Sequence, residues 1–244
     1  TVEVLRDGAA AQYGSDAIAG VINFILKDNS EGISLTAQTG QYYEGDGTEY
    51  VVAGNIGLPL GKDGFLSISA EYSDTEATVR AAPYCESWAC TDPSDPRFPG
   101  GDQSLAGFSL DSYLAGLPDA NIGDGDVVQP WGQPTSEAFR AFYNAGYDLG
   151  EVELYSFGNY SKSEADGNFF YRYPGNGTIE DLRLEDGSLW SPLLFFPGGF
   201  TPLFSGEVTD YSLVGGLRGE TSSGFSWDVS GRFGHNEIEY TLKN

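Results

Sequence analysis

Aromatic side chains are the residues of this sequence best suited to recognising another molecule. Tyr84, Trp88, Trp131, Trp190 and Phe200 stand in stretches rich in Gly, Pro and Asp. Exposed rings stack on sugars or on flat chelates at a small cost in conformational entropy. These five residues are therefore candidate ligand contacts. The alternative is that they pack against one another and order the segments that carry them.

The two cysteines are the second group of candidate functional residues. Cys85 and Cys90 lie close together in the stretch CESWAC, and the single histidine, His235, is far away in sequence. The spacing is compatible with a small-loop disulfide, with two free thiols or with half of a metal site. Acidic runs such as TDPSDP and IEDLRLEDG lack the ligand order of an EF-hand. The sequence also shows no nucleophile elbow or catalytic-triad spacing. We predict no metal site, no cofactor and no enzymatic activity.

Charge and composition narrow the class of protein. The 244 residues include 12 basic and 36 acidic ones, a net charge of −24. Such a chain will not bind nucleic acid by neutralising phosphates. With 34 glycines and 14% aromatic residues, it has the composition of a β protein with many turns. No apolar run approaches the ~20 residues of a membrane helix, but β-barrels span membranes with shorter, alternating strands.

A period of two runs through most of the chain and predicts strands. The pattern is clearest where Leu66, Ile68 and Ala70 alternate with Ser67 and Ser69. Further strands are predicted within 32–43, 49–60, 138–150, 152–164, 210–220 and 225–240. The apolar face of the last two is predicted to hold Leu213, Leu217, Phe225, Trp227 and Val229. In 152–164 the pattern does not decide which side chains share the apolar face.

The connections between these strands alternate in length. Short turns are predicted at 60–64, 148–150 and 221–224, and long insertions at about 81–135 and 173–207. Tight turns at one end and long loops at the other are typical of outer-membrane barrels. A soluble β-sandwich, whose strands also alternate, is the other architecture compatible with the pattern.

The first stretch of the chain, VEVLRDGAAAQYGSDAIAGVINFILK at residues 2–27, is different in character. It resembles the end of the plug domain of TonB-dependent outer-membrane receptors, which lies just before the first barrel strand. Asp7-Gly8 departs from the Gly-Pro that many members of the family have there. The specific resemblance covers this stretch only, and its most characteristic matches are Arg6, Tyr13, Gly14, Ser15, Gly20 and Asn23.

The resemblance implies a fold and a division of the chain. Residues 1–28 would be the last β-α-β piece of a plug domain. Residues 29–244 would be the first part of an all-β, antiparallel transmembrane β-barrel, with about seven strands. We therefore expect the chain to be a fragment of a longer receptor.

The resemblance also implies a function. Members take up scarce nutrients, such as siderophores, cobalamin, haem or oligosaccharides, across the outer membrane of Gram-negative bacteria. Expected partners are outer-membrane lipid, the small-molecule or oligosaccharide ligand, and the TonB energy-transducing complex, reached through a TonB box absent from this chain. In an exported protein, Cys85 and Cys90 would form a disulfide. The alternatives are a secreted β-sandwich carbohydrate-binding module and a passive porin, although a porin lacks the plug segment.

Overall fold

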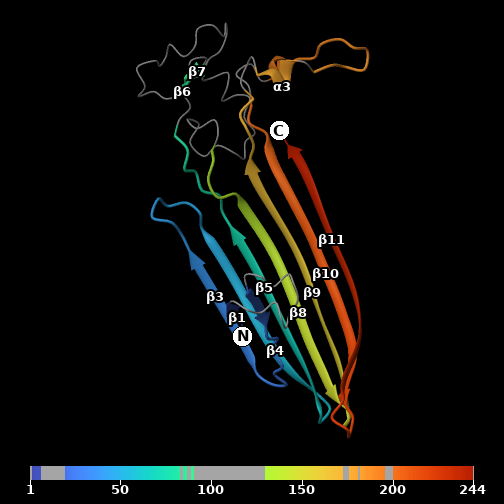
Figure 1. The fold of residues 1–244 in the computed structure, drawn as a ribbon. Helices are drawn as coiled ribbons and strands as arrows, with labels where there is room; N and C mark the ends of the chain where they lie inside the picture. Colours follow the sequence, from blue (N-terminus) through green and yellow to red (C-terminus); the bar gives the residue numbers. More distant parts are fainter. Residues whose placement is uncertain are drawn as a thin grey trace.

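A single large antiparallel sheet dominates the structure, a computed structural model that describes residues 2–6, 20–82, 85–86, 89–90, 130–172, 176–180, 182–195 and 200–243. Its seven strands follow one another as neighbours in chain order (Figure 1). They are β3 (Ile33–Gly40), β4 (Glu49–Leu60), β5 (Gly64–Thr75), β8 (Thr135–Asp148), β9 (Val152–Asn168), β10 (Leu203–Glu220) and β11 (Ser226–Lys243). The predicted all-β class, the strand number and the antiparallel order are confirmed.

Strand boundaries differ from the sequence-based prediction by a few residues, and most at the start of β10. The second long loop was expected to reach residue 207, but β10 begins at Leu203. Residues 203–207 pair with residues 164–168 of β9. Pro202 and Gly206 give this segment the composition of a loop, yet ladder hydrogen bonds satisfy its backbone groups and keep it in the sheet.

The two ends of the sheet differ, as the sequence predicted. At one end the chain reverses through short turns whose glycines adopt positive φ: Gly61 at 64°, Gly150 at 99° and Gly224 at 80°. Glycine adopts this conformation without a steric penalty. At the other end, drawn uppermost in Figure 1, the chain passes from β5 to β8 and from β9 to β10 through long connections. We call these the turn end and the loop end.

The strand register divides the side chains into two faces, because residues directly opposite one another in a ladder point to the same side. Ile68 pairs with Tyr143, and Leu213 pairs with both Gly158 and Phe233. We call their side the apolar face. Its exposed large side chains are Ile33, Leu35, Tyr50, Val52, Leu58, Leu60, Ile68, Tyr72, Phe139, Leu154, Tyr160, Tyr211, Leu213, Leu217, Val229 and Phe233.

The opposite side, the polar face, carries mainly hydroxyl, amide and charged groups. Ser67, Ser69 and Asn159 are examples on β5 and β9. The register also settles the ambiguous segment 152–164: Leu154 belongs to the apolar face, whereas Tyr155 and Phe157 point to the polar face. The side chains predicted to share the apolar face within strands do so: Leu66, Ile68, Ala70, Leu213, Leu217, Trp227 and Val229.

The sheet is open. Its edge strands are β3 and β11, which are not paired with each other, so the seven strands do not form a closed barrel. Among the described residues, no second sheet covers the apolar face. The structure therefore shows the antiparallel sheet, while closure into a barrel stays a prediction.

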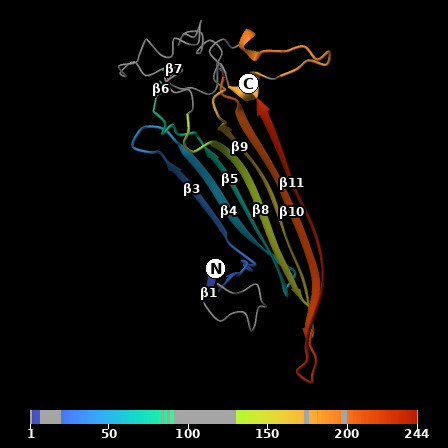
Figure 2. The same cartoon turned by 45° about the horizontal axis from the view of Figure 1, so that its top comes forward.

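The N-terminal stretch forms a separate hairpin. Strands β1 (Val2–Arg6) and β2 (Gly20–Phe24) pair only with each other, with Val4 opposite Ile22. Figure 2 shows this hairpin apart from the seven-stranded sheet. Both predicted strands are present, and the short helix predicted between them falls at 7–19, outside the described residues.

The remaining elements are short and lie in the loop-end connections. They are β6 (Cys85–Glu86), β7 (Ala89–Cys90), α3 (Gly177–Glu180) and a 3-10 turn η1 (Pro192–Leu194). Within the described parts of the chain, no helix is both long and apolar enough to cross a membrane.

The backbone arrangement supports a test of the predicted disulfide. Cys85 and Cys90 are direct partners in the β6–β7 ladder. Opposed Cα atoms in antiparallel ladders lie about 4.5–5.5 Å apart, within the range that a disulfide bridges. We expect the mature protein to be two hydrogens lighter than its reduced form and to resist alkylation until reductant is added. Alkylation of both thiols in the untreated protein would contradict the prediction.

Candidate functional site at the loop end

Three chain segments are tied together at the loop end of the sheet. The guanidinium of Arg80, just after β5, donates to both carboxylate oxygens of Asp46 in the β3–β4 loop, at 2.5 and 2.9 Å. The Val79 backbone N–H donates to the same carboxylate at 3.1 Å, and Arg80 lies over the Tyr42 ring at 5.3 Å. The β3–β4 loop is thereby fastened to the chain that leaves β5.

The same strand extension holds the segment that enters β8. The Thr78 N–H donates to the Gln133 carbonyl at 2.9 Å, and the Gln133 N–H donates to the Thr78 hydroxyl at 2.8 Å. The Arg80 N–H donates to the Trp131 carbonyl at 2.8 Å. These bonds fix the backbone of Trp131, whose side chain stays 47% exposed.

Trp131 begins a chain of ring contacts across the loop end, which we call the aromatic row. It consists of Trp131, Phe170, Phe169, Phe204 and Tyr240. Successive ring centroids are 5.4, 5.4, 5.8 and 5.1 Å apart, distances at which aromatic pairs attract one another. The row links the segment before β8 to strands β10 and β11.

One cation lies beside the aromatic row. The Arg172 guanidinium is 5.3 Å from the centre of the Phe169 ring, and Tyr240 at the far end is 64% exposed. Open rings next to a guanidinium can stack on a flat or ring-shaped ligand and can also attract a negative group. The loop end therefore offers a recognition surface, and nothing in it requires covalent chemistry.

The predicted ligand residues have different surroundings. Trp131 belongs to the aromatic row. Phe200 is only 8% exposed, and its backbone pairs with that of Arg172, the residue whose guanidinium lies beside the row. Trp190 is half-buried, with the Phe195 ring 6.4 Å away.

Tyr84 and Trp88 lie outside the described residues. Sequence reasoning missed Phe169, Phe170, Phe204 and Tyr240. The one local signal for these residues in the sequence is the aromatic doublet Phe169-Phe170, which follows a predicted strand. The contact with Tyr240 depends on strand pairing over a long sequence separation.

The residues that carry the plug resemblance are only partly described. Gly20 has φ of 137° and pairs with the backbone of Arg6, and the Asn23 amide donates to Glu3 at 3.1 Å across the hairpin. The Arg6 side chain, Tyr13, Gly14 and Ser15 lie outside the described residues.

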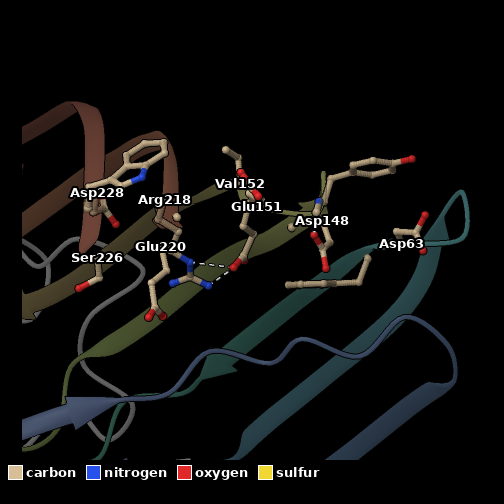
Figure 3. A pocket seen from close by; sticks show the side chains of 15 residues that line it. Asp63, Asp148, Glu151, Val152, Arg218, Glu220, Ser226 and Asp228 are labelled. Atoms are coloured by element: carbon tan, nitrogen blue, oxygen red, sulfur yellow. Dashed lines mark hydrogen bonds and ion pairs between the residues drawn. The ribbon is translucent and has the colours of Figure 1, made fainter. Parts of the chain in front are cut away.

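A second concave region lies at the turn end, about 990 Å³ in volume (Figure 3). Arg218 on β10 donates to both oxygens of Glu153 on β9, at 2.7 and 2.8 Å, and lies 5.2 Å from the Tyr155 ring. Tyr155 in turn donates to Asp228 on β11 at 2.7 Å. The network joins three strands. The six carboxylates that line the hollow are Asp63, Asp148, Glu151, Glu153, Glu220 and Asp228.

These carboxylates do not form a metal centre. Among the described residues, no group of His, Cys, Asp or Glu side chains is arranged to hold a metal ion. Arg218 bonds Glu153 and Tyr155 bonds Asp228, while the other acids lie at or beside the three turns between strands (Figure 3). The hollow is therefore an acidic surface between strand ends.

Comparison with known proteins adds no assignment. No protein-family model matches this chain, and no curated protein sequence matches it significantly. The functional argument accordingly rests on the residues and geometry described above.

The Asp46–Arg80 pair gives a prediction for the loop end. The bond from Arg80 lowers the pKa of Asp46 below the ordinary value of 3.8. A lowered pKa in the folded state means that the contribution to stability is complete above the ordinary value and is lost as the pH falls through the lowered one. Asp46→Asn should therefore reduce hydrogen-exchange protection of residues 76–82 at neutral pH, by about threefold.

Acidification provides the internal control for this prediction. Wild-type protection factors in 76–82 should fall as the pH drops below 3.8, whereas the Asp46→Asn variant should show no such step. Asp63→Asn at the turn end should leave the segment unchanged. Equal protection in all three proteins would mean that the pair does not hold the loop end.

Proposed function

We propose that this chain belongs to an energy-coupled outer-membrane transporter of the TonB-dependent kind, which takes up a scarce nutrient. The observation that carries the proposal is a two-faced antiparallel sheet: its apolar face is exposed, and its polar face holds the N-terminal segment. In a plugged barrel the apolar face contacts lipid and the polar face lines a lumen filled by the plug.

The size of the apolar face supports contact with lipid. Exposed large apolar side chains occupy one side of all seven strands. Soluble domains rarely expose a contiguous apolar surface of this extent. Such a surface marks a site of contact with another protein or with a membrane. A β-sandwich carbohydrate-binding module, the main alternative, would cover this face with a second sheet. No such sheet exists among the described residues.

The apolar face changes character toward the loop end. Glu137, Glu164, Glu207 and Glu239 are directly opposed across β8 to β11 on this face. Lys162 bonds Glu207 at 3.0 Å. Ionised groups are unfavourable in hydrocarbon, so a lipid-facing band on this face would end below the row of glutamates. The longest strands would then extend beyond the membrane into water.

The open edges fit the same proposal. β11 presents 18 residues along the outer edge of the sheet. Long exposed edges favour pairing with another strand, and in a barrel the neighbouring strands would satisfy their backbone groups. The aromatic row at the loop end would face the ligand on the extracellular side. The TonB complex would act from the turn end.

Lysine substitutions on the two faces test the membrane assignment. Ile68→Lys and Val229→Lys, on the apolar face, should each lower the free energy of unfolding in a bilayer by roughly 2–4 kcal/mol near the midplane. Ser69→Lys and Ser230→Lys, next to them on the polar face, should cost much less. Urea titration in lipid vesicles measures the difference. Equal tolerance on both faces would indicate a soluble sheet.

Uptake by cells that carry the protein tests the transport assignment. Accumulation of a labelled ferric siderophore, cobalamin, haem or oligosaccharide should depend on TonB. Trp131→Ala should weaken ligand binding about tenfold, the effect of losing an aromatic anchor. Trp88→Ala and Trp190→Ala test the other two candidates, and exposed Thr178→Ala is the control. TonB-independent accumulation of every ligand would contradict the proposal. Trp variants equal to the control would instead assign the rings a packing role.

A further inference from the structure

The link between the N-terminal hairpin and β3 lies directly on the polar face. This link, residues 27–32, is contacted by the backbone of β4 at Gly57 and by side chains from β5 and β8. We call it the joint. The groups of the sheet that make these contacts belong neither to the plug resemblance nor to the predicted ligand residues.

A directional series of hydrogen bonds holds the centre of the joint. The Asn55 amide donates to the Ser67 hydroxyl at 3.0 Å, and that hydroxyl donates to Asn29 Oδ1 at 2.8 Å. The Asn29 amide then donates to the Glu31 carbonyl at 3.2 Å. Ser67 is 3% and Asn55 8% exposed. If the joint leaves, the buried Ser67 hydroxyl loses its Asn29 acceptor. Asn55 stays bonded within the sheet, to Ser67, the Ile68 carbonyl and Ser69, and so positions the Ser67 hydroxyl.

Steric fit reinforces these bonds at Gly57 on β4. A Cβ atom at Gly57 would lie 2.6 Å from the Asn29 carbonyl oxygen and 2.7 Å from the Glu31 nitrogen. The backbone of the joint therefore crosses β4 at a distance that only glycine permits. The Gly57 N–H also donates to the Gly32 carbonyl at 2.8 Å.

The start of the joint is held by a different strand. The Asn144 amide on β8 donates to the Lys27 carbonyl at 2.9 Å. The hairpin that precedes the joint contrasts with it, because its apolar side chains are open: Val4 is 59%, Ile22 60% and Phe24 69% exposed. Among the described residues, the hydrogen bonds named above attach 27–32 to the polar face, and Ile25 and Leu26 line a hollow together with Phe65 and Asn144 of that face.

We propose that the joint is a fixed anchor, positioned by Asn29, Ser67, Asn55 and Gly57, and that displacement of the preceding hairpin stops at the joint. Resting on the proposed function, this means that a pull on the segment during transport is stopped at Asn29 and does not reach β3. The anchor itself is a property of the fold and can be tested without any transport assay.

Hydrogen-exchange mass spectrometry on the whole protein in detergent micelles provides the test. Asn29→Ala and Gly57→Ala should each speed exchange in peptides spanning 25–32 by about tenfold, while peptides of β4 and β5 stay protected. Gly54→Ala is the matched control, because its Cβ would lie at an ordinary 3.5 Å from the Ser34 carbonyl oxygen. Ser73→Ala is a control on the polar face of β5.

Each outcome of the exchange experiment has its own interpretation. Faster exchange confined to 25–32 supports the anchor, and Asn29→Ala keeps the test valid if Gly57→Ala does not fold. Unchanged exchange in 25–32 overturns it. An equal rise throughout β4 and β5 also overturns it, because the bonds would then stabilise the sheet rather than the joint. Faster exchange in 25–32 with transport unchanged would support the anchor and count only against its role in the proposed function.

Discussion

Backbone pairing across seven consecutive strands is the constraint on which the rest of this structure depends. Each strand must place its N–H and C=O groups opposite those of its neighbours. Once the register is set, it determines the face of the sheet to which each side chain points. Ile68, Tyr143 and Gly158 thus share one side with Leu213 and Phe233. A one-residue slip anywhere would mix apolar side chains with the serines and carboxylates of the other side.

The polar face follows from the same register and acquires a second role. Its amides and hydroxyls do not form a uniform wetted surface, because several of them bind the chain's own link to the N-terminal hairpin. Gly57, Ser67 and Asn144 come from three strands, yet they contact one short segment. Small and polar residues on this face therefore permit close approach of another backbone, which bulky side chains would prevent.

The kind of side chain changes along the length of the strands, from the turn end to the loop end. The turn end gathers carboxylates around the Arg218–Glu153 pair, the middle of one face is apolar, and the loop end carries the glutamate row and the aromatic row. Under the proposed function, this order would match an aqueous compartment, a hydrocarbon layer and a second aqueous compartment.

The sequence by itself determined the local features of this protein. Alternation set by Leu66, Ile68 and Ala70 against Ser67 and Ser69 predicted the strands and their faces, and short glycine turns against long insertions predicted the two ends. Only the tertiary structure decided which distant residues meet. Tyr155 and Phe157 are aromatic and would suit an apolar face. The pairing of β9 with β8 and with β10 directs their side chains to the polar face instead. The Asn29 joint and the row from Trp131 to Tyr240 depend on contacts between strands far apart in the chain. Periodicity is a local property and carries no information about such contacts.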